Sequence, residues 1–167
     1  MNIYLIGFMG TGKSTVSKQL AAKLGWGVLD TDAYIEEKQS RKIRDIFAAE
    51  GEAAFRDMET KALQEIAELD NEVVSCGGGI VLRRENAEIM RRSGRIILLK
   101  ASPETIFERV RFGSDRPLLN GNMNVEYISQ LMNKRMPLYE YAADSLVDTD
   151  GRSVLEISEK IIDLCDI

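Results

Sequence analysis

The sequence of 167 residues contains no histidine at all. A catalytic histidine and a histidine-ligated metal are therefore excluded, and any general base must be Asp, Glu, Lys or Tyr. The only two cysteines, Cys76 and Cys165, are too few for a disulfide framework and form no Cys-x-x-Cys pair. No apolar run approaches the ~20 residues that a membrane-spanning helix needs, so we expect no membrane partner.

Positive charge is also scarce, since 27 acidic residues against 22 Lys and Arg leave a formal net charge of −5. This balance argues against broad nucleic-acid binding. An acidic protein that binds an anionic ligand must gather its cations locally, which makes the positions of its arginines informative. The first residues resemble a strand and a loop and have no signal-peptide pattern, so we expect a cytoplasmic protein. The length suits one domain over 1–167.

What the sequence does contain is a phosphate-loop pattern, Gly7-Phe8-Met9-Gly10-Thr11-Gly12-Lys13-Ser14. Its glycines let backbone N–H groups point at an anion, while Lys13 can reach phosphates and Ser14 can offer a hydroxyl to Mg²⁺. An apolar strand at 2–6 precedes the loop and a helix at 14–24 follows it. An ordinary glycine-rich turn is the alternative, but these flanks would place phosphates on a helix N-terminus and favour nucleotide binding.

A second candidate site is Asp30-Thr31-Asp32, which follows the expected strand 27–29. Ligands of open α/β sheets bind at the carboxyl ends of strands. Thr31 or Asp32 could instead cap the helix that we expect to start at Ala33. Capping explains only one of the two acids, so the pattern favours a ligand site.

Three successive glycines, Gly77-Gly78-Gly79, follow a third expected strand at 73–75. They allow backbone to approach a ligand closely, whereas a flexible turn needs only one or two glycines. Earlier in the chain, Arg56 sits off the centre of an apolar helical stripe that begins after Gly51. Taken alone, its position favours a solvated helix charge.

The remaining pattern completes an α/β fold. The unbroken apolar run at 96–99 predicts a buried fourth strand, and 145–148 a fifth strand, while Ser102-Pro103 predicts a helix start. Five strands that alternate with helices predict a parallel sheet covered on both faces, a three-layer sandwich. The polar segment at about 111–123 reads as a mobile lid.

Six motifs in order resemble those of the shikimate kinase family. They are Gly-Phe-Met-Gly-Thr-Gly-Lys-Ser at 7–14, Asp-Thr-Asp at 30–32, Gly-Glu-x-x-Phe-Arg at 51–56, Gly-Gly-Gly at 77–79, Arg-Pro-Leu-Leu at 116–119 and Arg-x-Pro-Leu-Tyr at 135–139. The resemblance runs through nearly the whole chain. It implies a fold like that of phosphate-loop nucleoside monophosphate kinases, with substrate-binding helices at about 31–67.

The resemblance also implies a reaction, the ATP-dependent phosphorylation of the shikimate 3-hydroxyl in aromatic amino-acid biosynthesis. Its catalytic residues would be Lys13, Asp32 and Arg116. The ATP-binding residues would be Gly10, Thr11, Gly12, Lys13, Ser14, Thr15, Arg109, Arg116 and Arg152. The substrate-binding residues would be Asp32, Arg56, Gly77, Gly78, Gly79 and Arg135.

Ser14 and Asp30 would hold the Mg²⁺ that accompanies ATP. Asp32 would hydrogen-bond the attacking hydroxyl, and two arginines, Arg56 and Arg135, would grip the substrate carboxylate, because guanidinium groups donate in parallel to two oxygens. The partners implied are ATP and shikimate, with the protein a monomer. The alternatives are another small-molecule kinase, for gluconate or a nucleotide, and a non-catalytic nucleotide-binding relative.

Overall fold

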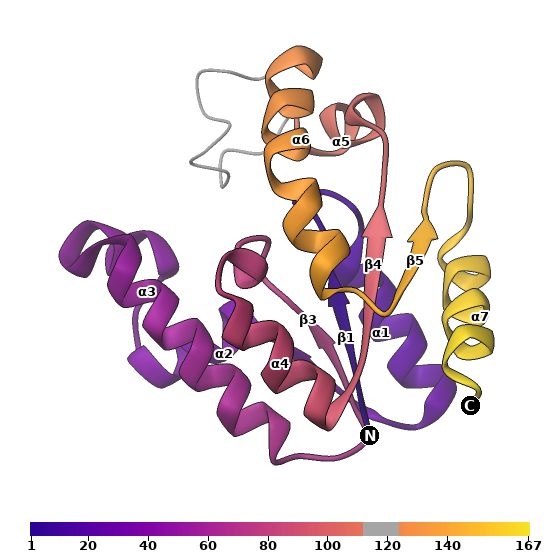
Figure 1. Ribbon diagram of the computed structural model, residues 1–167, viewed down its shortest axis with the longest axis horizontal. Coiled ribbons are helices and arrows are strands. Elements are labelled where there is room, and N and C mark those ends of the chain that lie inside the picture. Colours follow the sequence, from indigo (N-terminus) through magenta and orange to yellow (C-terminus); the bar gives the residue numbers. More distant parts are fainter. Residues whose placement is uncertain (112–123) are drawn as a thin grey trace.

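The computed structural model describes residues 1–111 and 124–167, and within these residues five strands form one parallel sheet (Figure 1). The strands are β1 Asn2–Ile6, β2 Gly27–Asp30, β3 Glu72–Ser75, β4 Gly94–Lys100 and β5 Ser145–Asp148. Their order across the sheet is β2-β3-β1-β4-β5, with every neighbouring pair parallel. The carboxyl ends of all five strands therefore lie along one edge of the sheet.

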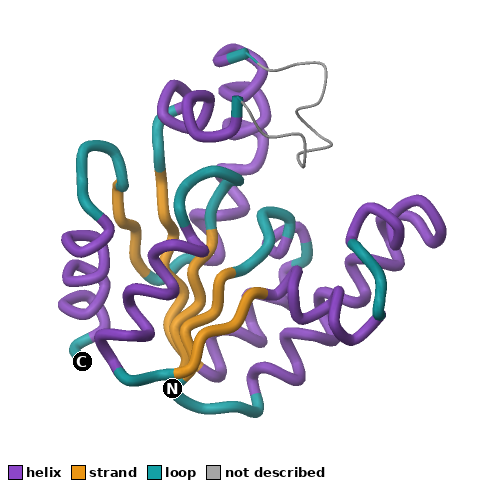
Figure 2. The backbone as a smooth tube through the Cα atoms, turned by 180° about the vertical axis from the view of Figure 1, so that it is seen from behind, coloured by secondary structure: helices purple, strands orange, loops and turns teal. Residues whose placement is uncertain are grey.

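Helices cover both faces of this sheet (Figure 2). They are α1 Lys13–Leu24, α2 Thr31–Gln39, α3 Ile43–Ala67, the short 3₁₀ turn η1 Ile80–Leu82, α4 Arg84–Ser93, α5 Pro103–Val110, α6 Val125–Ala142 and α7 Val154–Cys165. None of the helices in the described part of the chain is long and apolar enough to cross a membrane.

The central strand β1 shows why the fold has three layers. Tyr4 and Ile6 join a buried cluster with residues of α3, α4 and α6, whereas Ile3 and Leu5 join a second cluster with α1 and α7. Successive side chains of a strand point to opposite faces, so a strand buried on both sides must be apolar throughout. The three-layer α/β sandwich with five parallel strands is confirmed.

The helix pair α2 and α3 projects beside β2 and has a small core of its own (Figure 1). This core contains Ile35, Ile46, Phe55 and Ala62. Gly51 interrupts α3 with φ 84° and ψ 176°, so α3 consists of two helical segments, as the glycine predicts. The pair spans the range 31–67 that we expect to bind substrate.

The structure corrects the expected cap and start of α2. Asp30, and neither Thr31 nor Asp32, caps α2, because its Oδ1 accepts the N–H of Ala33 at 3.0 Å. The helix thus starts two residues earlier than expected. The predicted lid falls mainly outside the described residues, and Arg116 lies outside them too.

Candidate active site

The phosphate loop connects β1 to α1 at the sheet edge where the strands end. Gly10 and Gly12 have φ of 80° and 94°, a left-handed conformation that residues with a Cβ rarely adopt. The ammonium of Lys13 donates to the carbonyl oxygens of Gly7 at 2.7 Å and Phe8 at 3.0 Å. The lysine therefore lies across its own loop, with its charge beside the glycine turn.

Ser14 and Asp30 meet where α1 begins and β2 ends. The Ser14 hydroxyl lies 3.4 Å from Oδ2 of Asp30 and 3.4 Å from the hydroxyl of Ser75. Mg²⁺ prefers oxygen ligands and keeps several waters, so it binds one or two protein oxygens together with phosphates. A hydroxyl and a carboxylate fit such a site. The described residues contain no group of three or more His, Cys, Asp or Glu side chains able to hold a metal.

Asp32 lies in the first turn of α2, against the backbone of Gly77. A Cβ at Gly77 would be only 2.7 Å from Oδ1 of Asp32, so the glycine makes room for the carboxylate. Burial and the neighbouring Asp30 raise the pKa of Asp32 to about 6, while Lys13 acts in the opposite direction. The buried Thr31 hydroxyl accepts the N–H of Gly77 at 2.9 Å and fixes this contact, although the sequence suggested only a capping role for Thr31.

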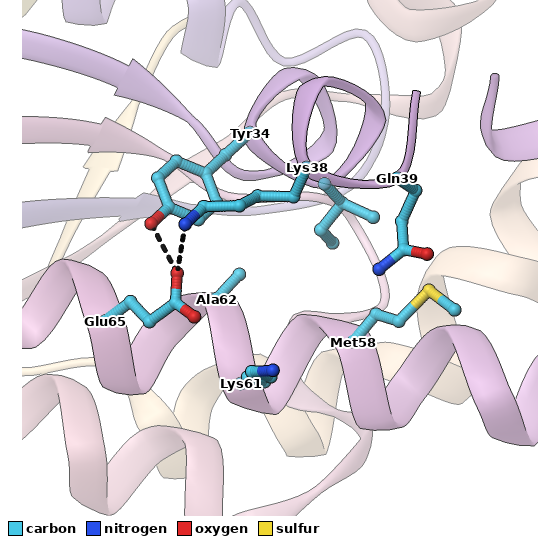
Figure 3. A pocket seen from close by; sticks show the side chains of 8 residues that line it. Tyr34, Lys38, Gln39, Met58, Lys61, Ala62 and Glu65 are labelled. Carbon is cyan, nitrogen blue, oxygen red and sulfur yellow. Dashed lines mark hydrogen bonds and ion pairs between the residues drawn. The ribbon is translucent and has the colours of Figure 1, made fainter. Parts of the chain in front are cut away.

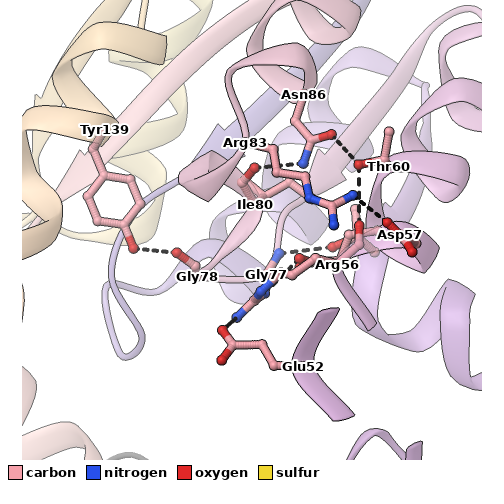
Figure 4. A network of polar contacts seen from close by, with 12 residues as sticks. Glu52, Arg56, Asp57, Thr60, Gly77, Gly78, Ile80, Arg83, Asn86 and Tyr139 are labelled. Atoms are coloured by element: carbon pink, nitrogen blue, oxygen red, sulfur yellow. Dashed lines mark hydrogen bonds and ion pairs between the residues drawn. The ribbon is translucent and has the colours of Figure 1, made fainter. Parts of the chain in front are cut away.

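The other two glycines of the triplet face the two arginines. A Cβ at Gly78 would lie 3.6 Å from Nη1 of Arg135, and one at Gly79 would lie 2.6 Å from Cζ of Arg56. The hydroxyl of Tyr139 donates to the carbonyl oxygen of Gly78 at 2.6 Å and ties α6 to the loop (Figure 4). The loop thus gathers one carboxylate and two guanidinium groups around three residues without side chains.

Arg56 is not the solvated helix charge that its sequence position favours when taken alone. Its side chain is 13% exposed, and its guanidinium donates to Glu59 at 2.6 Å and to Glu52 at 3.2 Å. It also lies over the ring of Phe55, 5.3 Å from the ring centre. Arg56 is held at the edge of the site by two carboxylates and an aromatic face.

Sequence analysis missed Glu59. This carboxyl group is 1% exposed, and its second oxygen, Oε2, has no hydrogen-bond partner among the described residues. Burial raises the pKa of Glu59 to about 7, against the opposing effect of Arg56. The only signal in the sequence was its spacing of three residues from Arg56, which many exposed helix charges share.

The remaining candidate residues lie around the phosphate loop. Arg109 on α5 donates to the carbonyl oxygen of Gly10 at 2.9 Å. Thr15 and Val154 line a hollow of about 510 Å³ between α1 and α7. Arg152 is exposed in the loop before α7, where its N–H donates to the carbonyl oxygen of Thr149 at 3.3 Å. The structure brings Arg109 to the loop but leaves the side chain of Arg152 at the surface.

A further hollow of about 190 Å³ lies between α2 and α3, and none of the candidate residues lines it (Figure 3). At its rim the hydroxyl of Tyr34 donates to Glu65 at 2.6 Å, and Lys38 pairs with the same carboxylate at 3.2 Å. These contacts brace the two helices that carry Asp32 and Arg56.

Fold and site together define a phosphate-loop protein whose anion-binding loop faces a polar site built on a separate helix pair. The family model for shikimate kinase matches residues 9–166. The chain is 45% identical to the shikimate kinase of Thermodesulfovibrio yellowstonii, over 96% of this chain and 92% of that protein, and 43% identical to that of Dehalococcoides mccartyi, over 97% and 92%. The chain belongs to the shikimate kinase family.

Solved structures agree with this membership. A structure of shikimate kinase from Acinetobacter baumannii in complex with shikimate superimposes with a TM-score of 0.91 at 35% identity. The superposition covers 98% of this chain and 91% of the other. The similarity therefore extends over the sheet, the phosphate loop and the helix pair α2 and α3.

Proposed function

We propose that the protein transfers the γ-phosphoryl group of ATP to the 3-hydroxyl of shikimate, giving shikimate 3-phosphate and ADP. Membership of the shikimate kinase family supports this reaction. The observation that carries it is the triple-glycine loop, whose residues face Asp32, Arg135 and Arg56 in turn. A carboxylate next to two guanidinium groups suits a substrate that has both hydroxyls and a carboxylate.

The phosphate loop would hold the ATP phosphates through the backbone N–H groups of Gly10, Thr11 and Gly12 and the ammonium of Lys13. In the structure this ammonium contacts two loop carbonyls, so it needs only to turn outward to meet a phosphate. Arg109, which donates to the carbonyl oxygen of Gly10 beside the loop, would contact the nucleotide.

We propose that residues farther from the phosphate loop also bind ATP. Thr15, which lines the hollow between α1 and α7, would lie on the adenine side, together with Arg152 from the loop before α7. Arg116 would offset charge on the phosphates during transfer, as phosphoryl transfer generally requires.

Ser14 and Asp30 would bind Mg²⁺, which when present offsets negative charge on the phosphates. Asp30 would serve two purposes, since its Oδ1 caps α2 while its Oδ2 faces Ser14. The cap would fix the carboxylate that reaches the metal, and Asp32 follows it by two residues on the same turn.

Asp32 would accept a hydrogen bond from the attacking hydroxyl and align its oxygen with the γ-phosphate. In the loose transition state of phosphoryl transfer, such positioning contributes more than complete removal of the proton. A pKa of about 6 leaves the carboxylate mostly ionised at neutral pH, yet close enough in basicity to take the proton as the bond forms.

Arg56 and Arg135 would bind the substrate carboxylate from two sides of the triplet. Glu59 and Glu52 would each hold one terminal nitrogen of the Arg56 guanidinium, and the second N–H of each of these nitrogens would bind the substrate. The absence of side chains at Gly77, Gly78 and Gly79 would let the substrate ring approach the backbone.

A coupled assay of ADP release tests the proposal. Release should require both shikimate and Mg²⁺, and gluconate or nucleoside monophosphates should not replace shikimate. Activity with one of these and none with shikimate would indicate another small-molecule kinase, and binding of ATP without turnover would indicate a non-catalytic relative. We also propose a cytoplasmic monomer, and light scattering during size-exclusion chromatography tests the oligomeric state.

Arg56→Ala and Arg135→Ala should each weaken shikimate binding far more than ATP binding. Removing one partner of a buried charge-assisted pair costs roughly 2–5 kcal/mol. Titration of each ligand separately measures the difference. Equal losses of affinity for both ligands would contradict the assignment of the two arginines to the carboxylate.

A further inference from the structure

A chain of buried hydrogen bonds lies behind the site, among residues to which the proposed function assigns no role (Figure 4). Asn86 on α4 donates its side-chain amide N–H to the carbonyl oxygen of Ile80 at 2.8 Å. The hydroxyl of Thr60 on α3 donates to Oδ1 of Asn86, also at 2.8 Å. Thr60 and Asn86 are both buried, so these bonds join α3 to η1 through α4 in the interior.

The direction of each bond is fixed by chemistry. The carbonyl oxygen of Ile80 can only accept, so the amide nitrogen of Asn86 must face it and the amide oxygen must face Thr60. The Thr60 hydroxyl has a single hydrogen, which this arrangement commits to Asn86, although the carbonyl oxygen of Arg56 lies 3.2 Å away. An apolar side chain at either position would leave buried polar groups unpaired.

The two hydrogen bonds lie on either side of the close contact between Gly79 and Arg56. Thr60 lies one helical turn after Arg56, so both side chains emerge on the same side of α3. Ile80 directly follows Gly79, whose backbone packs against the Arg56 guanidinium. Thr60 therefore anchors one side of the contact between Gly79 and Arg56, and Asn86 anchors the other.

We propose that Thr60 and Asn86 are positioning residues that fix the guanidinium of Arg56 relative to the triple-glycine loop, and so set its grip on the substrate carboxylate. The inference rests on the proposed function of Arg56. The Nε of Arg56 is buried without a hydrogen-bond partner among the described residues, so only its two terminal nitrogens are held by protein carboxylates. The direction of the guanidinium therefore depends on how closely the loop packs against it.

An exposed ion pair joins nearly the same elements and provides a matched comparison. Arg83, which follows η1, pairs with Asp57 on α3 at 2.7 Å, with side chains 31% and 72% exposed. Exposed pairs contribute little because water screens the attraction. Loss of this pair should have far less effect on Arg56 than loss of the buried chain.

The test compares five variants in the ADP-release assay. Thr60→Val keeps the shape and removes the hydroxyl, Thr60→Ser keeps the hydroxyl, and Asn86→Leu breaks the chain from its other end. Asp57→Asn removes the exposed pair. Ile161→Ala on α7 lowers stability on the opposite face of the sheet. For each variant we measure KM for both substrates, turnover and Tm.

We expect Thr60→Val and Asn86→Leu to raise KM for shikimate on the order of tenfold, because a displaced Arg56 guanidinium would lose part of its charge-assisted contact with the substrate carboxylate. KM for ATP should change by less than about twofold, and Thr60→Ser should restore KM for shikimate. Asp57→Asn and Ile161→Ala should leave KM for shikimate near the unsubstituted value, whatever their effect on Tm. A loss of Tm with KM for shikimate unchanged in both Thr60→Val and Asn86→Leu would overturn the inference.

A measurement without turnover separates this inference from the proposed function. The ¹H–¹⁵N signal of Arg56 Nε, identified by its loss in Arg56→Lys, should shift or broaden in Thr60→Val and return in Thr60→Ser. If the unsubstituted protein does not phosphorylate shikimate, the proposed function fails, and this signal still decides the positioning of Arg56. An Arg56 signal that is unchanged in Thr60→Val overturns the inference by itself.

Discussion

At the scale of single residues, Asp32, which is partly buried, and Glu59, which is fully buried, differ in their surroundings. Burial raises the pKa of both. Asp32 packs against the bare backbone of Gly77, where we propose that it meets the substrate hydroxyl. Glu59 accepts a hydrogen bond from Arg56 through one oxygen, so it acts mainly by holding the arginine in place. The same chemical group can thus act on the substrate or on a neighbour.

We expect Asp32→Asn to lower turnover on the order of 10²-fold or more, as for a positioned general base. Asn keeps the shape and removes the charge and basicity. Because Asp30 caps α2, the substitution removes no cap, and it relieves the burial of a carboxylate. Tm should therefore be unchanged or higher. Steady-state kinetics and a melting curve check both expectations, and normal turnover would exclude Asp32 from the chemistry.

Glu59 should make the stability of the protein depend on pH. Its ordinary pKa is 4.5, and burial raises the pKa in the folded protein to about 7. Well below pH 4.5 the group is protonated in both the folded and the unfolded protein, so folding buries no charged carboxylate and loses no stability from it. As pH rises, the unfolded chain ionises first, and the free energy of unfolding falls until the folded group has also ionised, somewhat above pH 7.

Glu59→Gln removes this titration. The stability of the unsubstituted protein relative to Glu59→Gln should therefore decrease between pH 5 and 8, by a few kcal/mol at most from roughly 1.4 kcal/mol per pKa unit. Urea unfolding of both proteins across this range measures the difference. Parallel curves would show that Glu59 has the same pKa in the folded and unfolded states.

At the scale of elements, the sequence predicted which segments meet but not how their side chains share partners. The order strand, glycine loop, helix is a local pattern, and the structure has it at the phosphate loop. The predicted cap of α2 was wrong because any of three neighbouring polar residues could serve as the N-cap. Asp30 is the one whose backbone is extended just before the helix begins. Glu59 was missed because burial of a helix charge depends on the packing of α3 against distant segments.

The triple-glycine loop allows a test in which neighbouring glycines should respond differently. Gly79→Ala would place a methyl group 2.6 Å from Cζ of Arg56, whereas Gly78→Ala would make an ordinary 3.6 Å contact with Arg135. Gly79 has φ −94° and ψ 5°, which alanine can adopt, so no backbone strain is added. Because the guanidinium can move aside, Gly79→Ala should preserve folding and displace Arg56.

We expect Gly79→Ala to weaken shikimate binding on the order of tenfold or more, from partial loss of a charge-assisted contact. Its Tm should stay within a few degrees of the unsubstituted value, and Gly78→Ala should change shikimate affinity much less. Calorimetric titration with shikimate and a melting curve measure both. Equal losses of shikimate affinity in the two variants would mean that alanine disturbs the loop itself and does not act through Arg56.

At the scale of the whole molecule, the parallel sheet explains how segments far apart in sequence form one site. Ser14, Asp30 and Ser75 follow or end three different strands and meet because β2, β3 and β1 are neighbours. The sequence predicted five strands and two covered faces from apolar runs alone. Their order across the sheet could not be read from those runs, because an apolar run does not specify which other strand it pairs with.

The two ligands should stabilise the folded protein separately, because they are expected to bind to different parts of it. A ligand that binds only the folded state at about 100 times its Kd adds roughly 2.7 kcal/mol to the free energy of unfolding. For a chain of this length, each kcal/mol raises Tm by about 2–4 °C. Shikimate and Mg²⁺-ATP, each at that concentration, should therefore raise Tm by several degrees on their own.

The variant Arg56→Ala distinguishes the two sites within one experiment. It removes an arginine on α3 that is proposed to bind the carboxylate of shikimate, away from the phosphate loop. The Tm increase with shikimate should therefore disappear at the same concentration, while the increase with Mg²⁺-ATP remains. Excess EDTA should reduce the ATP increase and leave the shikimate increase intact, because Ser14 and Asp30 are expected to hold the metal beside the phosphates alone. Loss of both increases in Arg56→Ala would mean that one site binds both ligands or that the variant is misfolded, and its circular dichroism spectrum separates these two causes.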